Sequence, residues 1–111
     1  MILITPRFLK FFAGKYVSAM ALWPFILVKN IETKESKVTI HHEKIHIRQQ
    51  IEMLVLPFYI AYLGFYFYYR LKGFNHFTSY MNIPFEKEAY YEESNFEYLL
   101  KRKFWAWRFF V

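Results

Sequence analysis

The 111-residue sequence contains no cysteine, which excludes disulfide bonds and thiolate metal sites. It has only four histidines, so a bound metal would need histidine and carboxylate ligands. It also lacks an uninterrupted apolar segment of the secretory type at its start, because Arg7, Lys10 and Lys15 break that segment, although Ala19-Met20-Ala21 resembles a processing site. Internal repeats and low-complexity segments are absent from the sequence, and its length predicts a single domain over residues 1–111.

Aromatic and basic residues are abundant. Phe, Tyr and Trp make up 24% of the sequence, and its net charge is +6. A small core cannot bury that many rings, so we expect some of them to face lipid, a partner subunit or a substrate groove. The cations are spread from Arg7 to Arg108 instead of forming one basic stretch, so nucleic acid is not an expected partner.

The order of apolar and polar segments predicts the elements. After an N-terminal segment over residues 1–18, residues 19–40 form a strand region in which Pro24 favours an edge or bulged strand. A long helix follows, with its active-site part over residues 41–72, Ser36 as a candidate N-cap and a kink expected at Pro57. A connector covers residues 73–82. A glutamate-bearing helix is predicted over 83–103, starting at Ile83-Pro84, and an aromatic tail over 104–111.

Residues Met53 to Tyr69 form a stretch of 17 residues without a charge. This length is at the lower limit for crossing a bilayer, and its five tyrosines favour an interface over a lipid interior. Three interpretations remain open: a membrane span, contact with a membrane surface or another subunit, and a soluble core helix.

The motif H-E-x-x-H occurs once, as His42-Glu43-Lys44-Ile45-His46. Histidines four residues apart lie on one helix face and can bind a single zinc ion, and the glutamate can act as general base toward a metal-activated water. The same pattern is also compatible with two surface histidines at the start of a solvated helix. His41 points about 100° away from His42, which predicts a surface or ligand-orienting position.

The acidic residues of the second predicted helix offer a third ligand, although they also suit a helix start by compensating its macrodipole. His76 and Tyr80 precede this helix and are candidate donors to an oxyanion, or else residues that pack the connector. Gln49 and Gln50 continue the motif helix and are candidates for orienting the ligands.

The pair HEKIH (42–46) and EKEAY (86–90) resembles the H-E-x-x-H and E-x-x-A motifs of gluzincin metallopeptidases. HEKIHIRQ is similar to the active-site helix of BlaR-type membrane metallopeptidases. The short spacing resembles the minigluzincins, and the layout over residues 19–103 resembles small bacterial proteins of this kind.

The resemblance implies an α+β, mostly helical fold: a minimal zincin-like domain with an edge strand or hairpin, a long kinked active-site helix and a glutamate helix. It implies Zn²⁺ as cofactor, His42, His46 and Glu86 as ligands, and Glu43 as general base. Glu86 is favoured as third ligand because Ala89 follows it by three residues, with Glu88 as the alternative. Tyr90 stands where the family has an acid that orients a ligand histidine, and residues 21–28 would supply the strand edge that binds an extended substrate.

The predicted function is zinc-dependent hydrolysis of peptide bonds, with Glu43, His76 and Tyr80 as catalytic residues and a peptide or protein as substrate. The alternative is a membrane-associated scaffold or interaction protein with a non-catalytic metal site. The sequence is compatible with membrane contact and with a homo-oligomer. The resemblance implies a bacterial protein, and we expect it to be membrane-associated or cytoplasmic.

Overall fold

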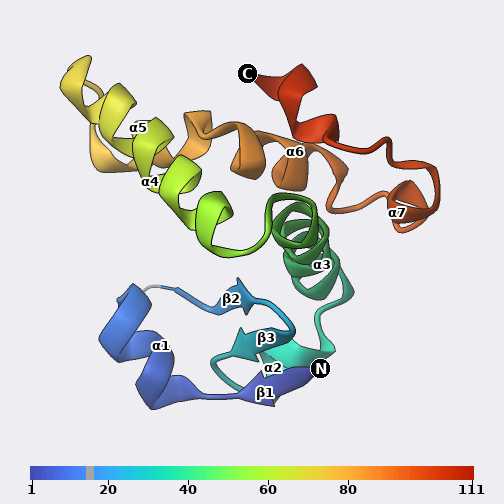
Figure 1. Ribbon diagram of the computed structural model, residues 1–111. Coiled ribbons are helices and arrows are strands. Elements are labelled where there is room, and N and C mark those ends of the chain that lie inside the picture. The colour runs from blue at the N-terminus through green and yellow to red at the C-terminus, as the bar shows by residue number, and fades with distance from the viewer. Residues whose placement is uncertain (15–16) are drawn as a thin grey trace.

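The structure is a computed structural model that describes residues 1–14 and 17–111, so Lys15 and Tyr16 of the predicted N-terminal segment lie outside the described residues. These residues form a small sheet and a larger set of helices, which confirms the predicted α+β, mostly helical class (Figure 1). The N-terminal segment contributes strand β1 (Ile2–Ile4) and helix α1 (Pro6–Ala13), two elements that were not predicted.

The apolar run over residues 19–28 folds as a hairpin. Strand β2 (Ala19–Leu22) pairs antiparallel with β3 (Phe25–Val28), and β1 pairs parallel with β3, so the sheet order is β1-β3-β2. Pro24 lies in the turn between β2 and β3, where its missing N–H removes no ladder hydrogen bond. The edge or bulged strand expected from Pro24 is thus a hairpin, in which β2 is an edge strand and β3 is the central strand of the sheet.

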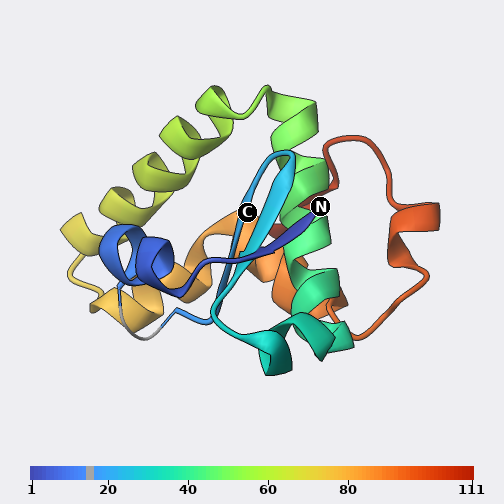
Figure 2. The same cartoon turned by 90° about the horizontal axis from the view of Figure 1, so that it is seen from below.

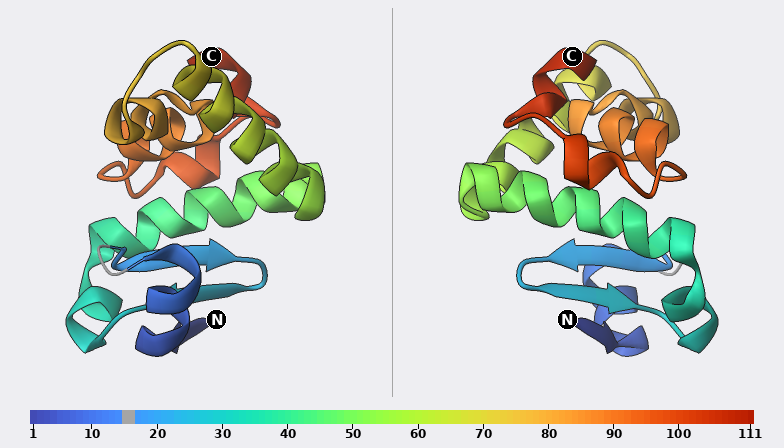
Figure 3. Two further views of the ribbon diagram at one scale, coloured as in Figure 1. Left: turned by 90° about the vertical axis from the view of Figure 1, so that its left-hand side faces the viewer. Right: turned by 90° about the vertical axis from the view of Figure 1, so that its right-hand side faces the viewer.

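Helix α3 (Lys37–Met53) carries the histidine motif and lies between the sheet and the helices that follow it in the sequence (Figure 3). The short helix α2 (Ile31–Glu35) precedes it, and Ser36 caps α3 as predicted, because its side chain accepts a hydrogen bond from the Thr39 amide. Ile40 of α3 packs with Ile26 and Val28 of the sheet. A helix covered on two sides can hold polar side chains away from water, which a metal site requires.

The long predicted helix is two helices in the structure. α3 ends at Met53, α4 runs over Leu56–Leu71, and the two axes are bent by 112°. The break is at Leu54 and Val55, which both have positive φ, whereas Pro57 lies in the first turn of α4, where a proline is well tolerated. The kink predicted at Pro57 is thus displaced by two to three residues. Within the described residues, no single helix is long and apolar enough to cross a membrane; α3 and α4 pass that test only as a bent pair.

Strain at the break leads to a first prediction. Leu54 has φ 58° and is 76% exposed, so it holds a left-handed conformation with little burial to offset the cost. Because this conformation costs an L-residue about 1–2 kcal/mol, we expect Leu54→Gly to raise the free energy of unfolding by about 1 kcal/mol in urea denaturation. Leu54→Ala is the control, since alanine removes the same side chain but keeps the strain. Equal stability of the two variants would contradict the explanation.

The C-terminal half departs from the prediction in its details. The predicted connector contains helix α5 (His76–Asn82), which Asn75 caps by accepting from the Thr78 amide. The glutamate helix is shorter than predicted: α6 spans Pro84–Glu92, and α7 (Tyr98–Lys101) follows after a break. The aromatic tail folds as a 3-10 helix, η1 (Ala106–Phe110), and Trp107 packs on Phe85 of α6 with ring centroids 4.8 Å apart.

Candidate metal site

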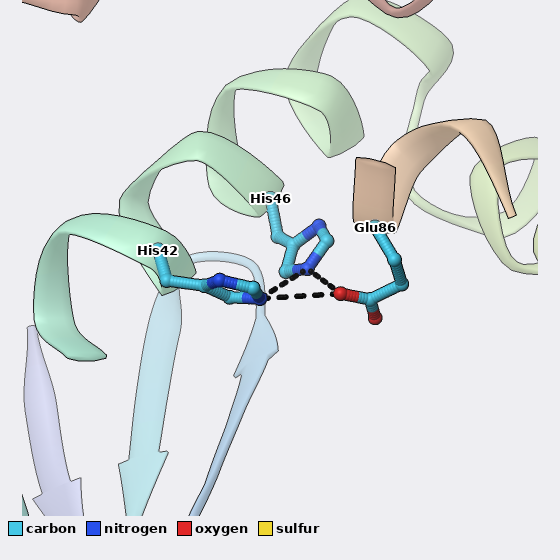
Figure 4. A group of neighbouring side chains, drawn as sticks. All are labelled: His42, His46 and Glu86. Carbon is cyan, nitrogen blue, oxygen red and sulfur yellow. Dashed lines mark hydrogen bonds and ion pairs between the residues drawn. The ribbon is translucent and has the colours of Figure 1, made fainter. Parts of the chain in front are cut away.

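Three buried side chains meet between α3 and α6: His42 and His46 from one face of α3, and Glu86 from the first turn of α6 (Figure 4). The two Nε2 atoms are 3.2 Å apart, and Glu86 Oε1 lies 3.1 Å from His42 Nε2 and 2.9 Å from His46 Nε2. These are the three ligands that the gluzincin resemblance implies.

The spacing of the three atoms suits a zinc ion. Donor atoms about 2.0–2.1 Å from zinc at tetrahedral angles are about 3.3 Å from one another. The observed separations of 2.9–3.2 Å need only a small expansion to reach that value. Two histidines and one glutamate are also a donor set that catalytic zinc sites use, with a fourth position left for water or substrate.

The outer nitrogens of both histidines are engaged. His46 Nδ1 lies 2.7 Å from Gln49 Oε1, and His42 Nδ1 lies 2.9 Å from Glu93 Oε2. The Gln49 amide group donates to the Phe85 carbonyl and to Glu88 Oε1, so its oxygen faces the histidine and Nδ1 must carry the proton. A carboxylate only accepts, so His42 Nδ1 is a donor as well. Each Nε2 is therefore the nitrogen available to a metal.

Such a group of acceptors requires a positive charge among them, either a proton or a metal ion. Burial alone would lower the pKa of His46, but the charge of Glu86 and its hydrogen bond outweigh burial and raise that pKa to about 9. For Glu86 the opposite holds: burial would raise its pKa, but His46 and the hydrogen bonds from both histidines lower it. The carboxylate is thus held as an anion facing the two rings.

Glu43 lies on the same helix and is buried beside these ligands. Burial raises the pKa of its carboxyl group, while the nearby His46 and His42 and a backbone hydrogen bond from Ala21 act in the opposite direction. Glu43 is thus close to both histidines and to Ala21 of β2, but it is not one of the three residues whose ligand atoms converge.

Part of the outer edge of β2 is already paired. The Ala21 carbonyl accepts hydrogen bonds from Gln50 Nε2, at 3.0 Å, and from the Tyr59 hydroxyl, and the Trp23 amide donates to Gln50 Oε1 at 2.7 Å. Gln50 thus fixes the sheet against α3 and α4 instead of contacting a histidine. The edge that the resemblance assigns to an extended substrate is therefore occupied by the protein's own groups at Ala21 of β2 and at Trp23 in the turn that follows.

Two residues at the site were missed in the sequence. Tyr62 of α4 donates from its hydroxyl to Glu86 Oε2 at 2.6 Å. Glu93 accepts from His42 Nδ1 at 2.9 Å, a contact that the gluzincin resemblance assigns to an acid at position 90. Glu93 is seven residues, two helical turns, after Glu86, so helical spacing could have found it. Tyr90 instead packs its ring on His42, with centroids 4.4 Å apart.

The two candidate oxyanion donors, Tyr80 and His76, lie in different surroundings. The Tyr80 hydroxyl lies 2.8 Å from that of Tyr90, and burial together with the charge of Glu86 raises the pKa of Tyr80. His76 is exposed and bonds to Tyr66, and none of the described contacts joins it to the three ligands. The expectation that His76 faces the metal therefore has no support in the described contacts.

Glu88 and His41 have structural partners. Glu88 is fully buried and bonds to Arg102, Tyr98 and Gln49, so its oxygens do not reach the ligand group. His41 is buried, not on the surface, and its Nδ1 donates to the backbone carbonyl of Glu93 at 3.0 Å. His41 thereby fixes the backbone of Glu93, the residue whose side chain accepts from His42.

Comparisons of the chain with protein-family models, with curated proteins and with solved structures find no significant match.

Proposed function

We propose that the protein is a zinc-dependent peptidase in which His42, His46 and Glu86 hold the metal. The observation that carries this proposal is the convergence of two Nε2 atoms and one carboxylate oxygen, with each Nδ1 kept as a donor by Gln49 or Glu93. The resemblance of HEKIH and EKEAY to the gluzincin motifs supports it from the sequence.

Zinc held there would supply a Lewis acid that polarises a peptide carbonyl and activates water for attack. Glu43 would act as the general base, accepting a proton on its carboxylate and passing it to the leaving amine. Burial raises the pKa of Glu43, which moves the group toward the range in which a general base works at neutral pH. His76 and Tyr80 were the two candidate donors to a developing oxyanion. Of these, Tyr80 would serve, because its phenol is close enough to Glu86 to be influenced by its charge.

The test of the proposal is the variant Glu43→Gln. Glutamine keeps the size of the side chain but cannot accept the proton, so we expect hydrolysis of an unfolded protein such as casein to fall about 10²–10⁴-fold with the zinc content unchanged. Both are measured on protein purified without added metal and then loaded with one equivalent of zinc. Glu97→Gln, an exposed position between α6 and α7, is the control. Full activity of Glu43→Gln would remove Glu43 as the base. Zinc-loaded native protein that hydrolyses nothing would favour the non-catalytic metal site instead.

A further inference from the structure

The outward face of α4 is apolar along its whole length. Five side chains, here called the outer stripe, are 52–89% exposed: Leu56, Ile60, Leu63, Phe67 and Leu71. Their spacings of four, three, four and four residues place them within about 80° of one another around the helix. Figures 1 and 2 both show α4 along one side of the molecule, and the exposure of the five side chains shows that this face points away from the rest of the fold.

The opposite face of α4 is apolar too, and it is covered. Phe58 is buried with Ile83 and Phe85, and Phe65 packs against this cluster. A helix that is apolar on all sides is normally covered on all sides, whereas no described residue covers the outer stripe. A continuous exposed patch of this kind marks an interaction surface.

Charge indicates which partner fits. No acidic residue occurs from Met53 to Phe85, and the two cations of this stretch, Arg70 and Lys72, lie exposed at the end of α4. Lys72 Nζ sits 4.8 Å from the ring centre of Tyr68, itself half exposed. Apolar side chains bordered by cations and a tyrosine match the boundary between acyl chains and anionic headgroups. If a second copy of the chain packed on this face, it would bring the same two cations, and the face has no acidic side chain to pair with them.

We propose that α4 docks on the surface of an anionic lipid bilayer, with the outer stripe in the acyl boundary and Arg70 and Lys72 among the headgroups. At 16 residues α4 is about 24 Å long, less than the roughly 30 Å of a bilayer core, so it lies along the surface. The inner face of the same helix carries Tyr62, which holds Glu86, so docking would bring the metal site close to the membrane. The docking itself requires no metal.

Vesicle flotation tests the proposal, using metal-free and zinc-loaded protein with phosphatidylcholine vesicles, with and without phosphatidylserine. We expect binding to the anionic vesicles only, weakened by salt and independent of zinc. Ile60→Gln with Phe67→Gln should reduce the partition coefficient at least about 10-fold, and Arg70→Gln with Lys72→Gln about fivefold for each cation. Leu100→Gln with Phe109→Gln is the matched control, because it removes two exposed apolar side chains elsewhere and should change nothing.

Three results would overturn the proposal. The first is native protein that stays with the aqueous fraction in the presence of anionic vesicles. The second is a control double variant that loses as much binding as the stripe variant. The third is a stable dimer in analytical ultracentrifugation that only the stripe variant dissociates, which would assign this face to contact between two copies. None of these outcomes depends on peptidase activity, so the docking surface and the proposed function can fail separately.

Discussion

Glu86→Gln is expected to weaken zinc binding by more than the roughly 10–100-fold typical of losing a group that only orients a ligand. The substitution keeps the shape of the side chain and its hydrogen bond with Tyr62, but removes the negative charge that lies 2.9 Å and 3.1 Å from the two histidines. Zinc affinity is measured by competition with a chromophoric chelator, on protein whose native circular dichroism spectrum has been checked.

Two control variants, with an intermediate and no expected loss of zinc affinity, show whether the effect is specific to Glu86. Glu93→Gln keeps all three ligands but weakens the acceptor at His42 Nδ1, so we expect the intermediate, 10–100-fold loss. Glu97→Gln removes an exposed carboxylate, 3.9 Å from Lys101, and should leave the affinity unchanged. If Glu86→Gln binds zinc like the native protein, Glu86 is not a ligand and the site must be sought elsewhere.

The half of the site that lies on one helix could be predicted from the sequence. His42, Glu43 and His46 are set by helical periodicity alone, and Ser36 is a local cap signal. Glu86 required the resemblance to a known family, because nothing local tells which carboxylate of a distant helix will face the histidines. Its neighbour Glu88, two residues on, points to Arg102 instead.

The parts that could not be predicted depend on tertiary contacts. Tyr62 belongs to a stretch whose composition suggests lipid contact, and only the 112° bend after α3 brings that stretch over Glu86. The bend itself lacks the usual signal, since Leu54 and Val55 are neither glycine nor asparagine although both have positive φ. In contrast, the start of α5 does have a local signal, because Asn75 is a favourable N-cap residue and accepts from the amide of Thr78. The predicted connector nevertheless contained no helix.

Arg102 is the residue whose removal we expect to cost most stability. Its side chain is fully buried, with Nη1 2.6 Å from Glu52 Oε2, and Nε and Nη2 facing the two oxygens of Glu88, which is also fully buried. Arg102→Met would leave these two carboxylates without their cation, and such a change typically costs about 3–5 kcal/mol. The loss is measured by urea denaturation, and Lys101→Met, which breaks an exposed pair, should cost less than about 1 kcal/mol.

Hydrogen bonds also connect Arg102 to the candidate metal site. We therefore expect its substitution to change zinc affinity as well as stability. Glu88 Oε1 accepts from Gln49 Nε2, and Gln49 Oε1 accepts from His46 Nδ1, so Arg102 fixes His46 through two buried neighbours. A second variant, Arg102→Met with Glu88→Gln, removes one of the two unpaired charges, leaves Glu52 as the other, and should recover part of the stability. Because the new amide can turn and release Gln49, we expect its zinc affinity to remain below that of the native protein. Full recovery of both properties would limit Arg102 to holding the C-terminal segment on the fold.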